Sequence, residues 1–330
     1  MLAPDPATPA AGARQKIPMT AKIPLLIDTD PGVDDALALL MAFDDPAHEV
    51  VGLTIAAGNV GLRHTVANAL KLCEVAGRGD VPVFPGCPSP LLHPAPDAAY
   101  VHGQDGFGDT GYTPAALAAA DEHAALAILR LSHEHAGRLL LVMLGPLTNL
   151  ALALKLDPSL PERVARLVIM GGAGDGRGNI TPAAEFNVYF DPEAAHLVFG
   201  AFERFDLADW TATLAHGLPH AGVEVWLAAG SARGRFFDAI SLHTRRWSAD
   251  SRGDRWFAAD ALAMAWALAP QGALEVAERA VEVDCGQGPG RGCTVVDWNA
   301  QTGRPQSARI LLRYDQASVE DRIRRALAAG

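Results

Sequence analysis

The chain has 330 residues, 49% of them hydrophobic, and a formal net charge of −11 at neutral pH. This length and apolar content can fill a large α/β core, and the excess of acidic residues disfavours nucleic acid and anionic membranes as partners. The four cysteines lie far apart without a C-x-x-C pair. That spacing fits neither a zinc site nor a disulfide framework, so we expect a cytoplasmic protein in a reducing compartment.

The first 22 residues are rich in Ala and Pro and contain no apolar run long enough for a signal sequence or a membrane span. We interpret residues 1–22 as a disordered N-terminal tail. No internal repeat or Gly/Ser linker divides the rest of the sequence. We therefore expect a single domain over residues 23–330.

Short apolar runs alternate with longer helical stretches from Ile23 onward. The runs predict strands at residues 23–27, 50–56, 81–84, 139–144 and 166–170. Helical spacing or propensity predicts helices at residues 34–43, 64–76, 123–135, 192–202, 222–230 and 258–269. This alternation predicts an α/β fold, a single Rossmann-like domain with a mainly parallel open sheet flanked by helices.

Two long polar, Gly-rich segments follow predicted strands, at residues 85–113 and 171–187. Loops of this length in compact domains usually have a function. Ligands of open α/β sheets bind beyond the carboxyl ends of the strands, so these loops indicate where a pocket should lie.

Four aspartates fall within eight residues of the segment LLIDTDPGVDDALALL, at a predicted strand-to-helix turn. They are Asp28, Asp30, Asp34 and Asp35. The helix dipole favours the last two, but only a bound cation also accounts for Asp28, which ends an apolar strand. Carboxylates without nearby Cys or His indicate Ca²⁺ or Mg²⁺ rather than zinc. The alternative is a capped helix start with solvated acids.

Two other acidic motifs begin in a similar way. An EF-hand loop counted from Asp28 needs Gly at its sixth position and Glu at its twelfth, where this chain has Val33 and Leu39, so that interpretation fails. An aspartate-based Mg²⁺ phosphohydrolase also begins with an apolar strand ending in D-x-D. It remains an alternative, although it does not explain the Pro-Gly-x-Asp-Asp that follows.

Polar side chains also follow the other predicted strands. They are Asn59, Asn149, Asn179, Glu185 and Asn187. Each alone is common in turns and helix starts, but together they would lie at one edge of the sheet. In an extended segment Glu185 and Asn187 would point to the same side and offer an acceptor and an amide to a polyhydroxylated ligand.

Asp260 is the only charged residue of the segment WFAADALAMAWALA. A carboxylate in so apolar a helix must lie at an exposed start, be paired, or bind a metal ion. Helix capping and metal ligation both remain open for this residue.

The acidic motif from Asp28 to Ala36 resembles the signature of the inosine-uridine preferring nucleoside hydrolase family. The similarity continues through GN at 58–59, HG at 102–103, GPLTN at 145–149 and GNITPAAEFNVYFDPEAA at 178–195. It covers nearly everything after residue 22.

This resemblance implies a Ca²⁺-dependent enzyme that hydrolyses ribonucleosides to ribose and a free base for nucleoside salvage, and that forms a homodimer or homotetramer. It implies that Asp28, Asp35, the carbonyl of Leu144 and Asp260 hold the ion, with ribose hydroxyls completing the shell. It further implies ribose contacts from Asp34, Asn59, Asn179, Glu185 and Asn187. Asp28 would also be the general base for an ion-bound water that attacks C1′.

The sequence departs from many relatives at Ala259, where a histidine is a candidate acid for the leaving base. We therefore consider His102 as the acid, with His243, Arg246, Trp247 and Trp256 as further candidates for proton donation or stacking. The loss of the histidine also keeps a non-catalytic nucleoside or pentoside-binding protein as an alternative. The preference for purine or pyrimidine bases stays open.

Overall fold

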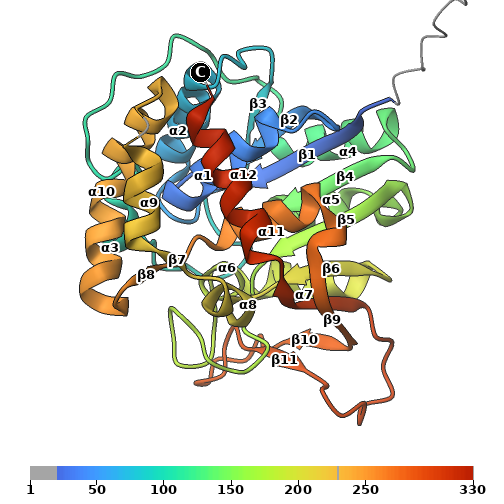
Figure 1. Cartoon of the computed structure of the whole chain (residues 1–330). Helices are drawn as coiled ribbons and strands as arrows, with labels where there is room; N and C mark the ends of the chain where they lie inside the picture. The colour runs from blue at the N-terminus through green and yellow to red at the C-terminus, as the bar shows by residue number, and fades with distance from the viewer. Residues whose placement is uncertain (1–20, 229, 330) are drawn as a thin grey trace, which may run out of the picture.

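The computed structural model describes residues 21–228 and 230–329 (Figure 1), so residues 1–20 of the predicted tail lie outside it. An eight-stranded sheet has the order β3-β2-β1-β4-β5-β6-β12-β9. Its strands are β1 (Ile23–Thr29), β2 (His48–Ile55), β3 (Val83–Pro85), β4 (Leu139–Met143), β5 (Val164–Met170), β6 (Phe205–Ala208), β9 (Ala273–Arg279) and β12 (Ala308–Tyr314). Only β9 runs antiparallel to its neighbour, which confirms the predicted mainly parallel sheet.

Helices cover both faces of the sheet. They are α1 (Val33–Asp44), α2 (Leu62–Val75), α3 (Ala99–His102), α4 (Ala124–Glu134), α5 (Thr148–Leu156), α6 (Phe186–Phe190), α7 (Pro192–Ala201), α8 (Trp210–Ala215), α9 (His220–Leu227), α10 (Ala232–Arg252), α11 (Ala259–Leu268) and α12 (Gln316–Ala328). Two short antiparallel pairs lie outside the sheet, β7 (Leu218–Pro219) with β8 (Arg255–Trp256) and β10 (Val281–Val283) with β11 (Thr294–Val296). Within the described residues, no helix is both long and apolar enough to cross a membrane.

The alternation of side chains along β1 separates two hydrophobic cores. Leu25 and Ile27 pack on one face with α1, α11 and α12, whereas Leu26 packs on the other with α4, α5 and α7. Both α1 and α11 are apolar around nearly their whole circumference. Helix α1 is covered by α11, α12 and the sheet, which bury its apolar surface. This packing places the first turns of α1 and α11 next to each other.

The sheet order reverses direction between β1 and β4, which are hydrogen-bonded neighbours. The chain leaves β1 toward β2 on one side, and leaves β4 toward β5 on the other. In open α/β sheets such a switch point opens a crevice beyond the carboxyl ends of the strands. The acidic motif follows β1 directly, so it lies at this crevice.

Strands β6 and β12 and the long helix α10 were not predicted from the sequence. Strand β6 is short and contains Asp206, which interrupts the apolar pattern. That buried carboxylate accepts hydrogen bonds from Arg166 Nε (2.7 Å) on β5 and Arg309 Nη1 (2.8 Å) on β12. An ionic contact across three strands thus replaces apolar packing at this point, and a search for hydrophobic runs does not find it.

Replacement of Asp206 with Ala should lower the free energy of unfolding by about 3 kcal/mol, because it leaves two partly buried guanidinium groups without their partner. Glu278→Ala is the matched control, since Glu278 forms an exposed ion pair with Arg204 on the same part of the sheet. We expect that control to cost less than about 1 kcal/mol. Urea denaturation measures both, and equal losses would contradict the structural role given to Asp206.

Candidate active site

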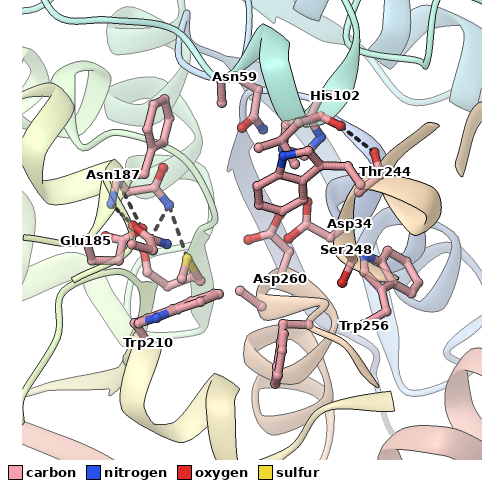
Figure 2. A pocket seen from close by; sticks show the side chains of 18 of the residues that line it. Asp34, Asn59, His102, Glu185, Asn187, Trp210, Thr244, Ser248, Trp256 and Asp260 are labelled. Carbon is pink, nitrogen blue, oxygen red and sulfur yellow. Dashed lines mark hydrogen bonds between the residues drawn. The ribbon is translucent and has the colours of Figure 1, made fainter. Parts of the chain in front are cut away.

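A pocket lies at the switch point, beyond the carboxyl ends of β1, β4 and β5 (Figure 2). Its polar lining includes Asp34, Asn59, His102, Asn179, Glu185, Asn187 and Asp260, and Leu144 also lines it. Several aromatic side chains line it as well, namely Tyr100, Phe186, Trp210, Trp247, Trp256 and Phe257. Most of the site residues expected from the sequence therefore line one cavity.

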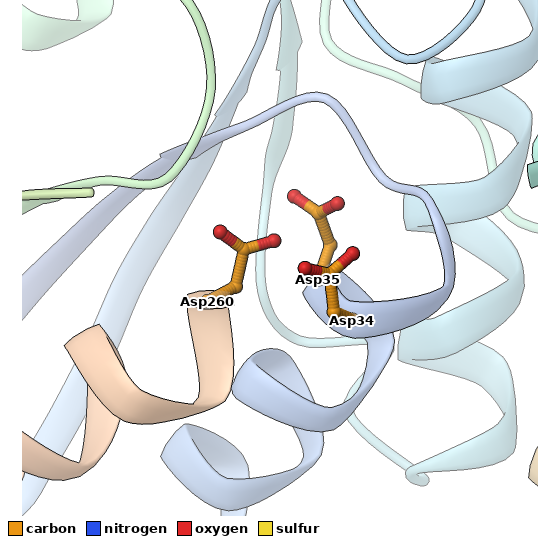
Figure 3. A group of neighbouring side chains, drawn as sticks. All are labelled: Asp34, Asp35 and Asp260. Carbon is orange, nitrogen blue, oxygen red and sulfur yellow. The ribbon is translucent and has the colours of Figure 1, made fainter. Parts of the chain in front are cut away.

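Three carboxylates from two helices meet in this region (Figure 3). Asp34, Asp35 and Asp260 each place one oxygen atom within 4.8 Å of the others. Asp34 and Asp35 belong to the first turn of α1, and Asp260 to the first turn of α11. Segments 225 residues apart in the chain thus form one acidic group because α1 and α11 pack against each other.

The acidic group carries an electrostatic cost that a cation would relieve. Burial raises the pKa of Asp34 to about 6, and burial together with the charges of Asp34 and Asp35 raises the pKa of Asp260 well above its usual range. The pKa of Asp35 is also raised, first by burial and then by Asp34. An all-oxygen donor set of this kind fits a hard divalent ion such as Ca²⁺ or Mg²⁺.

The orientation of Asp35 is fixed by its neighbours. Its Oδ1 accepts a hydrogen bond from the Thr29 hydroxyl, and its Oδ2 accepts from the Gly32 amide (2.9 Å) and from Asn59 Nδ2 (3.0 Å). The Gly32 contact also satisfies a free amide at the start of α1. The sequence of the turn therefore positions this carboxylate before any ligand binds.

The structure places Asp28 apart from the group formed by Asp34, Asp35 and Asp260. Asp28 Oδ2 accepts hydrogen bonds from Thr54 Oγ1 (2.7 Å) and Asn149 Nδ2 (2.9 Å). Its Oδ1 is buried and has no hydrogen-bond partner among the described residues. Burial raises the pKa of Asp28 to about 7, with no neighbouring carboxylate contributing. Asp28 is thus held at the end of β1 by contacts to β2 and α5.

The sequence analysis gave Asp30 no role of its own. In the structure, however, its carboxylate interacts electrostatically with the group formed by Asp34, Asp35 and Asp260. Its Oδ2 accepts a hydrogen bond from the Asn59 amide (2.6 Å). Burial raises its pKa well above the usual range, and the charges of Asp35 and Asp34 add to that effect. Asp30 also contributes to the raised pKa of Asp260, so its carboxylate lies within electrostatic reach of the group.

Helix α6 positions the remaining polar residues. The expectation of an extended segment through Glu185 and Asn187 is wrong, because α6 begins directly after Glu185. The Glu185 carboxylate caps this helix by accepting from the amides of Asn187 (2.9 Å) and Val188 (3.2 Å) and also accepts from Gly172 N (2.8 Å). Both side chains nevertheless line the pocket, and burial raises the pKa of Glu185 to about 7.

Leu144 follows β4 and lines the same pocket. Asn187 Nδ2 donates a hydrogen bond to the Leu144 carbonyl oxygen (2.7 Å), which joins the β4 end to α6. Asn179 accepts through Oδ1 from the Phe186 amide (2.8 Å) and so holds the start of α6 from the preceding loop. The end of β4, the loop through Asn179 and the start of α6 are therefore linked around the pocket.

His102 lies in the pocket wall, with its Nδ1 accepting a hydrogen bond from the Val33 amide (3.1 Å). Burial lowers the pKa of His102 to about 4, so the ring is neutral near pH 7. A neutral imidazole with Nδ1 as acceptor carries its hydrogen on Nε2 and can donate a hydrogen bond, but it is a poor proton source.

Among the other candidates from the sequence, Trp247 and Trp256 line the pocket, whereas His243 and Arg246 are exposed on α10. The structure adds Trp210, Arg252 and Phe257 to the lining, which sequence reasoning missed. They come from α8, the last residue of α10 and the segment after β8, and nothing in their spacing relates them to one another.

The fold and the site define a class of α/β protein with an acidic, cation-compatible pocket at the switch point of its sheet. Residues 25–321 match the family described as inosine-uridine preferring nucleoside hydrolase, and the chain belongs to this family. It is 33% identical to the pyrimidine-specific ribonucleoside hydrolase RihB of Escherichia coli over 297 residues, which are 88% of this chain and 92% of that protein. It is 48% identical to uridine nucleosidase 1 of Arabidopsis thaliana over 176 residues, so the match spans about half of each chain, 53% and 52%.

Solved structures agree with the fold. A plant nucleoside hydrolase, PpNRh1, superposes with a TM-score of 0.89 at 31% identity and covers 94% of this chain and 100% of its own. An inosine-guanosine nucleoside hydrolase superposes with a TM-score of 0.86 at 28% identity, again over 94% of this chain and 100% of its own.

Crowding of the carboxylates predicts an unusual pH dependence of stability in metal-free buffer. A folded-state pKa above the unfolded value of about 4 means that the cost of the charges is absent below about pH 4 and grows as the pH rises toward the folded-state pKa. Asp260→Asn should therefore stabilise the metal-free protein near pH 7.5 by about 1 kcal/mol or more and have little effect near pH 4. Thermal unfolding at both pH values tests this, and a variant less stable at both would contradict the crowding.

The same variant should bind Ca²⁺ at least ~10-fold more weakly than the native chain, because it loses one charged oxygen donor. Asp250→Asn on the exposed side of α10 is the matched control and should leave the affinity unchanged. Calorimetric titration of chelator-treated protein measures the affinity. Equal binding by both variants would place the ion elsewhere.

Proposed function

We propose that the chain hydrolyses the N-glycosidic bond of ribonucleosides in a Ca²⁺-dependent reaction that releases ribose and a free base. The observation that carries this proposal is the position of the carboxylates of Asp34 and Asp260 in one pocket with Glu185 and Asn187. Such a pocket offers charged oxygens to a cation and acceptors and amides to a sugar. The family and the activities named for the relatives support it.

The group that would hold the ion includes Asp35, Asp260 and the Leu144 carbonyl, as the family resemblance implies. Leu144 and Asp260 line the same pocket. Asp34 places an oxygen in the same group, and we expect it also to contact a ribose hydroxyl. When bound, a divalent ion supplies Lewis acidity and offsets the charge of the crowded carboxylates. Calcium is our choice because the donors are all oxygen and come from carboxylates and a carbonyl.

The ribose contacts are proposed for Asn59, Asn179, Glu185 and Asn187 in addition to Asp34. Each side chain is fixed by hydrogen bonds to backbone or to a neighbouring acid. Fixed polar groups lose little entropy on binding, so they orient the sugar with C1′ toward the carboxylates. The oxocarbenium-like state that forms as the glycosidic bond breaks is positive, and the surrounding acids stabilise it.

The proton of the attacking water must be taken up by a buried carboxylate. The family resemblance led to Asp28, but Asp28 makes its contacts to Thr54 and Asn149 and has no electrostatic link to the acidic group. The proposal for the base is instead Asp30, since its carboxylate lies within electrostatic reach of Asp34, Asp35 and Asp260. We propose that Asp28 positions the end of β1 while Asp30 accepts the proton.

This assignment predicts that Asp30→Asn lowers kcat for ribonucleoside hydrolysis about 10³-fold, because general-base catalysis is lost. Asp28→Asn should lower it by less than about tenfold, as it keeps the shape of the side chain. Steady-state release of base and ribose measures both, and Ca²⁺ titration of each variant separates the loss of a base from the loss of a ligand. A larger effect at Asp28 than at Asp30 would assign the base to Asp28.

Product identity separates this function from its alternatives. Free base and ribose are expected from a nucleoside, in equal amounts. A nucleotide that yields inorganic phosphate without free base would favour the Mg²⁺ phosphohydrolase, and binding of nucleoside without turnover would favour a non-catalytic binder.

We further propose a cytoplasmic homodimer or homotetramer that acts in nucleoside salvage. The four cysteines are free, which is consistent with a reducing compartment.

A further inference from the structure

The guanidinium of Arg252 lies among three aromatic rings at the pocket wall. Its Cζ is 4.7 Å from the ring centroid of Trp210, 5.0 Å from that of Trp247 and 5.9 Å from that of Phe257. These rings come from α8, from α10 and from the segment after β8. Arg252 and all three aromatic residues line the same pocket as Asp34 and Asp260.

Arg252 makes no hydrogen bond or ion pair within residues 21–228 and 230–329. A half-buried guanidinium has five N–H donors, and aromatic faces satisfy its charge but not those donors. The other buried arginines of this chain do have partners, as Arg233 has with Asp44 and Arg245 with Asp238. The unused donors of Arg252 therefore indicate a ligand that brings its own acceptor.

The proposed reaction requires a group that stabilises the departing base, and the residues discussed so far do not provide one. When the C1′–N bond breaks, its electron pair stays on the base, while the hydroxyl of water is added to C1′ and the water proton goes to a carboxylate. The base then carries negative charge until solvent protonates its nitrogen. Ala259 cannot supply a proton, and His102 is neutral near pH 7.

We propose that Arg252 donates hydrogen bonds to a carbonyl oxygen of the leaving base and stabilises its negative charge. This inference rests on the proposed function. A guanidinium cannot release its proton, so it acts by electrostatic stabilisation and not as an acid. Charge from the broken bond spreads onto carbonyl oxygen in uracil and hypoxanthine, but adenine has no such oxygen. The site should therefore favour oxo bases.

The test compares two substrates whose leaving groups differ in how much stabilisation they need. Arg252→Gln should lower kcat for inosine at least ~100-fold, because it removes the charge that stabilises the departing base. It should change kcat for p-nitrophenyl β-ribofuranoside less than ~10-fold, since p-nitrophenolate leaves readily without assistance. Arg252→Lys should recover part of the loss with inosine because it keeps the charge. Arg246→Ala, on the exposed side of the same helix, is the control and should change neither substrate.

Equal losses with inosine and with the p-nitrophenyl riboside would overturn the proposal, because a merely structural role of Arg252 affects both. A rise in KM without a fall in kcat would also overturn it, since the interaction would then be equally strong in the ground state and the transition state and would not stabilise the departing base in particular.

A binding measurement separates this proposal from the proposed function. Tryptophan fluorescence of the native chain, titrated with free hypoxanthine and free adenine, should show tighter binding of hypoxanthine, and Arg252→Gln should abolish the difference. If the native chain releases no base from any nucleoside, the proposed function fails, and this titration still decides whether Arg252 recognises oxo bases. Equal affinities of the native chain for the two bases would overturn the proposal.

Discussion

The packing of α1 against α11 is the contact on which the site depends. Both helices are almost entirely apolar, and each begins with aspartate in its first turn. Burial of the apolar surfaces brings like charges together. The favourable free energy of this burial offsets the electrostatic repulsion between the carboxylates. The metal-free form therefore stores a cost that a bound cation removes, so that the free energy of ion binding also stabilises the packing of the two helices.

The sheet supplies the second constraint. Because the order of strands reverses between β1 and β4, the connections that follow those strands run to opposite sides and leave room beyond the sheet. Asp34 from the acidic turn after β1, Leu144 after β4 and Asn179 from the loop that leads to α6 all line the pocket there. Polar groups that would be costly inside the sheet are thus gathered at its edge, where they bind each other and leave acceptors for a ligand.

Much of this was predictable from the sequence. Five strands and the helices α1, α2, α4 and α7 follow from apolar runs and helical spacing, whereas α3, α5 and α6 were not predicted. The acidic motif located the crevice because Asp34 and Asp35 begin a helix directly after a buried strand. The roles of Asp28 and Asp30 were not separable, since two acids two residues apart on a strand end look alike until their partners are known. Only the tertiary contacts of Thr54 and Asn149 distinguish them.

The later part of the chain was harder to predict for a physical reason. Strand β6 contains a buried charge that is satisfied by arginines from its neighbours, and α10 is amphipathic with many charged residues. The aromatic surroundings of Arg252 depend on three segments that meet only in the folded protein. Spacing along the chain carries no signal for such contacts.

The pocket lining comes from two sets of segments. Strand ends and the first turns of α1 and α11 carry the groups that face sugar and cation, whereas α8, the end of α10 and the residues after β8 carry the rings and the guanidinium. Substitutions in the second set would change the surface that meets the leaving group of the proposed reaction, while every carboxylate and amide of the first set stays in the sequence.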